Sequence, residues 1–245
     1  MISPREWRCF IVQPAGAWEV LSRRETFQSK GFLIAEDFLS SADCDAVLSA
    51  IDSERNGKAG RRDLINKPVI KRFAYDHRIS KLVYELAGEP SVPYKATIFD
   101  KSSDCNWLVP WHQDRSLPFN RRFDGPGWGP WTLKDGISFT LAPRWALDNV
   151  IALRIHLDDS TAENGPLRVI EGSHALGVID QAQVVAFASS SSYETCTVRK
   201  GGVIAMHPLL IHSSSRSRDA TPRRILHVEY SACREYPEGI KLGSN

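Results

Sequence analysis

The chain has 245 residues, of which 42% are hydrophobic and 24% charged, so it is long enough for one globular domain with a sizeable core. Its 31 basic and 29 acidic residues give a net charge of +2 and form no block of like charges, which argues against nucleic acid as a partner. The charged amino terminus lacks the apolar stretch of a secretion signal, and there is no apolar run of about 18 residues, so we expect a soluble, cytoplasmic protein without a membrane span.

The amino-terminal part of the sequence is predicted to be mainly helical. Val20–Ser29 has amphipathic spacing, residues 31–35 form a short apolar strand, and Ser40 or Ser41 can cap a helix that runs to about Ser53. Gly57 and Gly60 would end this helix, and a basic polar span follows over 61–71. The next helix is predicted over 80–87, where Gly88 and Pro90 stop it.

Short strand candidates, separated by glycine and proline turns, follow this helical part. They span residues 94–100, 107–114, 136–141, 150–158, 167–170, 195–199, 202–206, 209–213 and 223–231. Ala188–Ser192 is predicted to be a serine-rich loop. Many short strands preceded by helices indicate a sandwich or a barrel. We therefore predict a mainly β protein with one domain over 1–245, made of helical support over about 1–90 and a β sandwich or barrel over about 91–232.

Two of these strands have one apolar face and one polar face. Alternation puts Leu153, Ile155 and Leu157 on one face of the first strand and Arg154, His156 and Asp158 on the other. In the second strand the apolar face has Leu226, Val228 and Tyr230, and the opposite face has Arg223, Ile225, His227 and Glu229. If helices cover the apolar faces, the polar faces point into the barrel, where a metal and a dicarboxylate could bind.

His112-Gln-Asp114 is the strongest chemical signal in the chain. An imidazole and a carboxylate two residues apart point the same way from a strand and can bind one metal ion from one side. A third ligand is needed, and His212, at the end of the apolar run from Val203, is the best candidate. Two histidines and one carboxylate on one face form the ligand set of non-haem iron(II) oxygenases.

Other potential ligands are given structural roles. His207 lies five residues before His212 and would face the opposite side of a regular strand unless Pro208 introduces a bulge. His174 is predicted to be a structural contact, and His77 and His227 to be ordinary histidines. The cysteines Cys9, Cys44, Cys105, Cys196 and Cys233 are odd in number and contain no Cys-x-x-Cys pair, so neither a disulfide framework nor a zinc knuckle is expected.

A carboxylate anchor and a lid are also predicted. Arg223 shares the polar face of its strand, whereas Arg224 shares the face of Leu226, so Arg223 is the candidate partner for a carboxylate and Arg224 is expected to be exposed. The segment 115–149 is long and rich in tryptophan, phenylalanine and glycine, which favours a substrate lid, with a self-packed surface loop as the alternative.

Four segments resemble the phytanoyl-CoA dioxygenase family of iron(II)- and 2-oxoglutarate-dependent oxygenases. They are Gly31 to Asp45, Trp111-His-Gln-Asp114, Glu163 to His174, and His207 to His212 with Arg223, and together the resemblance covers most of the chain. It implies a double-stranded β-helix, a cupin-like jelly roll with flanking helices.

The resemblance also implies roles for individual residues. His112, Asp114 and His212 would bind iron(II), Arg223 with Ser214 would hold the distal carboxylate of 2-oxoglutarate, and Thr97 and Gln113 would lie near this cosubstrate. Arg154 stands where many members have tryptophan, so the wall of the cosubstrate site differs here. The asparagine that usually follows the distal histidine is also absent.

The expected reaction is hydroxylation of a C–H bond of a small organic substrate, with O2 consumed and succinate and CO2 released. Because Asp114 is a carboxylate, no ligand position is left for a halide, which argues against halogenation. Two alternatives stay open: a cupin-like enzyme that uses the same residues to bind zinc and activate water, and a jelly-roll binding protein without turnover. Arg223 argues against the first, and the intact ligand set argues against the second.

Overall fold

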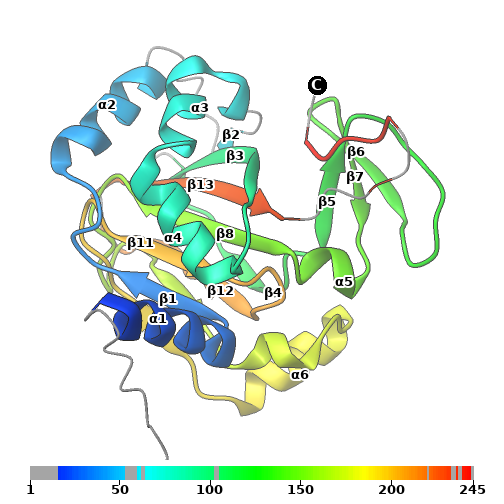
Figure 1. Cartoon of the computed structure of the whole chain (residues 1–245). Helices are drawn as coiled ribbons and strands as arrows, with labels where there is room; N and C mark the ends of the chain where they lie inside the picture. Colours follow the sequence, from blue (N-terminus) through cyan, green and yellow to red (C-terminus); the bar gives the residue numbers. More distant parts are fainter. Residues whose placement is uncertain are drawn as a thin grey trace, which may run out of the picture.

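Two antiparallel sheets form the body of the protein (Figure 1). The structure is a computed structural model, and it describes residues 16–52, 60–61, 64–101, 105–219, 221–232, 236 and 239–243. The major sheet has the order β1 (Phe32–Ala35), β11 (Val203–Met206), β8 (Val150–His156), β13 (Arg223–Ser231), β3 (Val92–Lys101), β2 (Gly60–Arg61). The minor sheet has the order β10 (Glu194–Cys196), β9 (Leu167–Val169), β12 (His212–Ser214), β4 (Val109–His112). The predicted turn residue Gly57 and the cysteines Cys9 and Cys233 lie outside the described residues.

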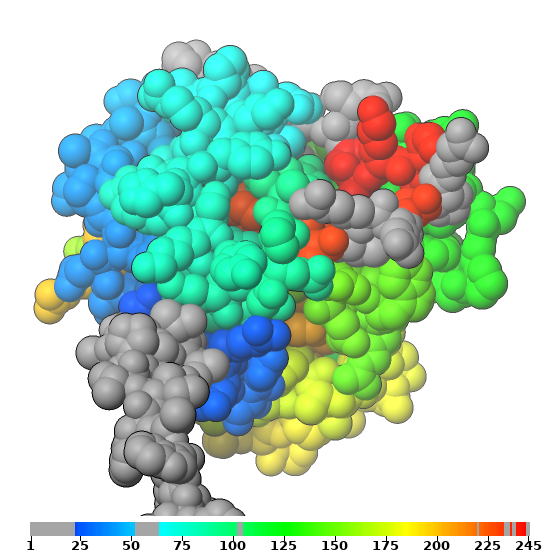
Figure 2. Space-filling model, in the orientation of Figure 1, coloured from blue at the N-terminus to red at the C-terminus, as the bar shows by residue number. Residues whose placement is uncertain are grey.

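Helices cover the outer face of the major sheet, as the apolar faces of its strands predicted. These are α1 (Gly16–Lys30), α2 (Ser41–Asp52), α3 (Pro68–Ala74) and α4 (His77–Ala87), with a 3-10 turn at Leu64–Asn66. Leu153, Leu226 and Tyr230 are in one buried cluster with Ile79 and Leu82 of α4. In Figure 2 the helices hide most of β13, of which small orange-red patches appear between them. No described helix has both the length and the apolar character needed to cross a membrane.

The helix boundaries differ from the prediction where capping decides them. α4 begins at His77 instead of Ser80, because the Asp76 side chain accepts a hydrogen bond from the backbone N–H of Arg78 and so caps the helix. It ends at Gly88, which adopts the left-handed conformation of a C-terminal cap with φ of 80°. The basic polar span over 61–71 contains the start of α3, whose first residue is Pro68, a residue suited to the first turn of a helix.

The inner face of the major sheet is polar at one end. The register places Lys101 beside Arg223, Thr97 beside His227 and Lys95 beside Glu229, and it places Arg154 of β8 on the other side of His227. The other end of the interior is filled by a buried apolar cluster that includes Ile204, Met206 and Leu210.

The segment 115–149 is a second structural unit and not an open lid. It forms a three-stranded sheet of β5 (Ser116–Phe119), β7 (Ile137–Leu141) and β6 (Trp131–Lys134), followed by the short helix α5 (Arg144–Leu147), and it stands beside the main body in Figure 1. Phe119 is 1% exposed and makes edge contacts with Phe123, Trp128 and Tyr236. No residue of 115–149 lines the cavity described below, so the aromatic residues pack on one another and not over that cavity.

A helix that the sequence analysis missed covers one edge of the minor sheet. α6 (Gln181–Ser190) packs on β4, and a 3-10 turn, Ser173–Leu176, leads into it. Asp180 and Gln183 form a reciprocal capping box at its start. The predicted serine-rich loop is therefore wrong for its first three residues, which are the last turn of this helix.

Candidate metal centre

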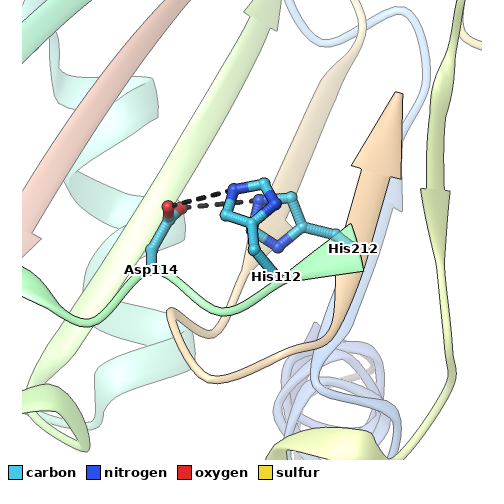
Figure 3. Close-up of side chains that lie close together, drawn as sticks. All are labelled: His112, Asp114 and His212. Carbon is cyan, nitrogen blue, oxygen red and sulfur yellow. Dashed lines mark ion pairs between the residues drawn. The ribbon is translucent and has the colours of Figure 1, made fainter. Parts of the chain in front are cut away.

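His112, Asp114 and His212 lie together, with the Asp114 carboxylate turned toward both imidazole rings, as Figure 3 shows. Their candidate ligand atoms all lie within 4.8 Å of one another. His112 ends β4 and His212 begins β12, and these two residues are direct cross-strand partners, so their ring centres are 4.1 Å apart. The carboxylate of Asp114 faces both rings, at 3.5 Å from Nε2 of His112 and 3.6 Å from Nε2 of His212.

Both histidines are held in the same orientation by the backbone. Nδ1 of His112 lies 2.8 Å from the carbonyl oxygen of Pro110, and Nδ1 of His212 lies 2.8 Å from that of Leu210. A carbonyl oxygen only accepts hydrogen bonds, so we assign the proton to Nδ1 in each ring. Each Nε2 then presents a lone pair toward the centre of the triad, which is the state that a metal ligand needs.

The three side chains of the triad shift one another's pKa values. Burial and the neighbouring His112 lower the pKa of His212 to about 3, so its ring is neutral near pH 7. Burial alone would raise the pKa of Asp114, but His212 and His112 outweigh it and hold that pKa well below its ordinary value. For His112, burial acts to lower the pKa, but the carboxylate of Asp114 outweighs it and raises that pKa above its ordinary value. A carboxylate and a neutral imidazole can accept a divalent cation.

Gln113 does not join this site. Strand alternation turns its side chain away from its two neighbours, where Nε2 donates to the carbonyl oxygens of Gly177 and Leu209, each at 2.8 Å. Its Oε1 accepts from the backbone N–H of Ile179. Gln113 therefore joins the backbone of residues 177–179 to that of Leu209, and, contrary to the expected contact with a cosubstrate, it does not line the cavity.

A cavity of about 170 Å³ adjoins the triad and leads to Arg223. Arg223 is 2% exposed, its Nε donates to the carbonyl oxygen of Asn164, and its buried Nη1 has no hydrogen-bond partner. Burial and the nearby Arg154 lower its pKa to about 9, so it stays cationic near pH 7. A buried guanidinium with a free donor is a strong site for a carboxylate.

Lys101 is a site residue that the sequence analysis missed. It pairs with Arg223 across the strands, is fully buried, and donates from Nζ to Oγ of Ser214 at 2.9 Å. Ser214 lines the cavity and donates in turn to the carbonyl oxygen of Gly165. Lys101 lies four residues after Thr97 and therefore on the same face of β3. Strand alternation would have predicted this position if the predicted strand had ended at residue 101 instead of 100.

Arg154 and His227 form another part of the cavity wall, and Thr97 is the neighbour of His227 on β3. Arg154 is 7% exposed and lies over the ring of Phe99 at 5.5 Å. Thr97 is buried beside them with an unpartnered Oγ1, although it does not line the cavity itself. His227, predicted to be ordinary, does line it, with Nε2 3.2 Å from Oε1 of Glu229.

Glu229 is the centre of a polar network at the same end of the barrel. Tyr94 donates to it at 2.7 Å and Lys95 at 2.6 Å. Burial would raise the pKa of Glu229, but Lys95 and His227 bring it down to about 2, so the group is ionised. Lys95 and Glu229 therefore neutralise each other.

Other predicted residues lie outside the triad. His207 accepts from the backbone N–H of Leu209 and has Nε2 3.4 Å from Asp148, and His174 contacts the carbonyl oxygen of Gln28, so the structural roles predicted for both are confirmed. Arg224 differs from the prediction of a freely exposed side chain. Its guanidinium makes two contacts of 2.7 Å with the carboxylate of Asp158, because β13 lies beside the end of β8.

The architecture is a double-stranded β-helix with a His-x-Asp…His triad between its sheets. The family model described as phytanoyl-CoA dioxygenase matches residues 27–225, and the chain belongs to that family. L-Proline trans-4-hydroxylase from Streptomyces griseoviridis is 27% identical in an alignment 182 residues long. The match covers 64% of this chain and 60% of that relative's length.

Two solved structures share the fold. AviO1 from Streptomyces viridochromogenes Tue57 has a TM-score of 0.65 and 20% identity, with 89% of this chain and 97% of that one covered. HygX from Streptomyces hygroscopicus, determined with nickel and 2-oxoglutarate, has a TM-score of 0.62 and 18% identity, with 86% of both chains covered.

Proposed function

We propose that the protein is an iron(II)- and 2-oxoglutarate-dependent oxygenase that hydroxylates a C–H bond of a small organic substrate, with release of succinate and CO2. The observation that carries the proposal is one cavity that joins a two-histidine, one-carboxylate set to a buried guanidinium with an unpartnered nitrogen. The relative named as an L-proline hydroxylase and the HygX structures, one with iron and one with nickel and 2-oxoglutarate, support this assignment.

The residues present fit both cofactors. His112, Asp114 and His212 would hold the metal through Nε2, a carboxylate oxygen and Nε2, because both Nδ1 atoms are engaged by carbonyl oxygens. When bound, iron(II) supplies the activation of O2 that the oxidation requires. Three protein ligands on one face leave room for a bidentate cosubstrate.

The protein residues bind and orient the cosubstrate. The unpartnered Nη1 of Arg223 would donate to the distal carboxylate of 2-oxoglutarate, and the Ser214 hydroxyl lies on the same wall. Lys101 fixes Ser214 from behind and adds positive charge to that end. Thr97 and Arg154 belong to the adjoining row. Binding by these groups excludes water from the deep end of the cavity.

The proposal is tested on anaerobic protein. Addition of iron(II) and then 2-oxoglutarate is expected to produce a visible metal-to-ligand charge-transfer band in the wild type. His112→Ala and His212→Ala should lose it, while His207→Ala, a neighbouring histidine outside the triad, should keep it. A wild type that binds iron(II) but forms no such band would overturn the proposal.

The reaction type needs a second measurement. In the presence of O2, L-proline and other small molecules are screened for their ability to stimulate succinate release. The mass of each product is then measured by mass spectrometry. Hydroxylation predicts a product heavier than the substrate by one oxygen atom. Stimulated succinate release with a product that has lost two hydrogens would replace hydroxylation by another oxidation and leave the cofactor assignment intact.

A further inference from the structure

Arg154 is a buried cation that makes no hydrogen bond or ion pair with any other residue that the structure describes. Its Nε is buried and unpartnered, and its guanidinium lies over the ring of Phe99. The nearby carboxylate of Asp114 raises the pKa of Arg154, but burial outweighs it and lowers that pKa to about 10. It is 7% exposed and lines the cavity beside the triad. A desolvated charge of this kind is costly unless something pairs with it.

The charges of the cavity show that the missing partner is an anion. The lining contains the cations Lys95, Arg154 and Arg223 and the carboxylates Asp114 and Glu229. Three cations against two carboxylates leave an excess of positive charge in the lining. Iron(II) and fully ionised 2-oxoglutarate carry opposite charges of equal size, so binding both leaves this excess unchanged. Lys95 is neutralised by Glu229 at 2.6 Å, and Arg223 is assigned to the distal carboxylate of 2-oxoglutarate. The excess therefore remains at Arg154.

The position of Arg154 separates it from the distal carboxylate site. Along β13, the partner of Arg154 is His227, four residues from Arg223, which corresponds to about 13 Å of extended strand. Arg154 is nearer to the open end of the cavity, where the Asp114 side chain is 41% exposed and the Lys95 side chain is 19% exposed. A substrate that enters beside the triad meets this end first.

We propose that the substrate to be oxidised carries a carboxylate, and that Arg154 binds this carboxylate beside the triad. The proposal rests on the function proposed above, since it assumes that 2-oxoglutarate occupies the Arg223 end. A guanidinium offers two parallel N–H donors, which match the two oxygens of a carboxylate. Substrates with an amide or an ester in place of that carboxylate would leave the guanidinium unpaired.

The test uses the anaerobic protein loaded with iron(II) and saturating 2-oxoglutarate, with propionate as the probe and propionamide as its neutral counterpart at equal ionic strength. Propionate is expected to raise the thermal midpoint of the wild-type complex and propionamide to leave it unchanged. Arg154→Gln and Arg154→Trp, which both remove the charge, should abolish the propionate effect, and Arg154→Lys should retain part of it. The tryptophan variant introduces a residue that resembles the family pattern and guards against a folding failure of the glutamine variant.

A competing role for Arg154 is a contact with the keto-acid end of 2-oxoglutarate, and titration of the charge-transfer band distinguishes it. If Arg154→Gln weakens 2-oxoglutarate binding tenfold or more, about 1.4 kcal/mol, while Arg154→Lys does not, Arg154 belongs to the cosubstrate and the inference is overturned. A propionate effect that is missing in the wild type, or that persists in Arg154→Gln, also overturns it. Absence of the band in the wild type would instead overturn the proposed function, so the two failures are distinguishable.

Discussion

Replacing Lys101 by methionine should change how the stability of the free protein depends on pH. Burial, together with the positive charges of Arg223 and Arg154, lowers the pKa of Lys101 from 10.5 to about 7 in the folded state. Between these two values the unfolded chain binds a proton that the folded protein does not bind, so the free energy of unfolding rises with pH. Below about pH 7 both states are protonated, and the cost of the buried ammonium is fully present.

The size of the effect follows from the two pKa values. Between pH 7 and pH 9, titration of Lys101 alone should raise the free energy of unfolding by about 2 kcal/mol, since each pKa unit corresponds to about 1.4 kcal/mol. For a chain of this length, that equals a shift of roughly 4–8 °C in the thermal midpoint.

The assay is urea unfolding of metal-free protein at several pH values, with wild type, Lys101→Met and Lys134→Met compared. Lys134 is exposed on β6, so its replacement should keep the wild-type pH dependence, whereas Lys101→Met should lose the rise of about 2 kcal/mol. Lys101→Met also removes hydrogen bonds, but their loss lowers the free energy of unfolding at every pH. The slope of that free energy against pH therefore reports the titration of Lys101 alone. Equal slopes in the wild type and Lys101→Met would show that Lys101 is solvated and refute the reasoning.

Three further substitutions test other parts of the structure. Arg223→Gln should weaken 2-oxoglutarate binding by about 2–5 kcal/mol, measured by titration of the charge-transfer band, and unchanged affinity would contradict the anchor assignment. Arg224→Gln should lower the free energy of urea unfolding by roughly 1–3 kcal/mol without changing that affinity, because the partly buried Asp158 loses its guanidinium partner and keeps only the backbone N–H of residue 224. Phe119→Ala should cost about 3–5 kcal/mol in the same unfolding assay and leave the charge-transfer band intact, and loss of the band would show that the small sheet contributes to the site.

Strand alternation alone predicted much of the site. Because side chains alternate along β13, the odd-numbered Arg223, His227 and Glu229 were predicted to lie on the inner face, where they line the cavity. The even-numbered Leu226, Val228 and Tyr230 were predicted to lie against the helices, and they belong to the core cluster there. The same rule shows why Gln113 was misplaced: the motif suggested a site residue, but its position between two inward residues turns it outward. Periodicity is informative here because one face of each strand is buried under helices.

Other features give weak periodic signals. α6 has small and apolar residues on most of its surface, so only its capping residues Asp180 and Gln183 mark it. β5 contains Pro118, and β6 is exposed over most of its length, so neither strand has the alternation of a half-buried strand. The pairing of Lys101 with Arg223 depends on contacts far apart in the chain, which propensity does not report.

The place of β13 in the major sheet has a consequence for the order of folding. This strand lies between β8 and β3, yet it is the last strand of the sheet to be synthesised, so the two neighbours cannot be joined until the ribosome has passed residue 231. Until then the edges of β3 and β8 that pair with β13 are unpaired, and they are open to association with other chains. Pairings between segments so distant in sequence also slow the search for the native arrangement. Expression at low temperature, which slows synthesis and aggregation together, is therefore the condition under which this fold should be recovered in the highest yield.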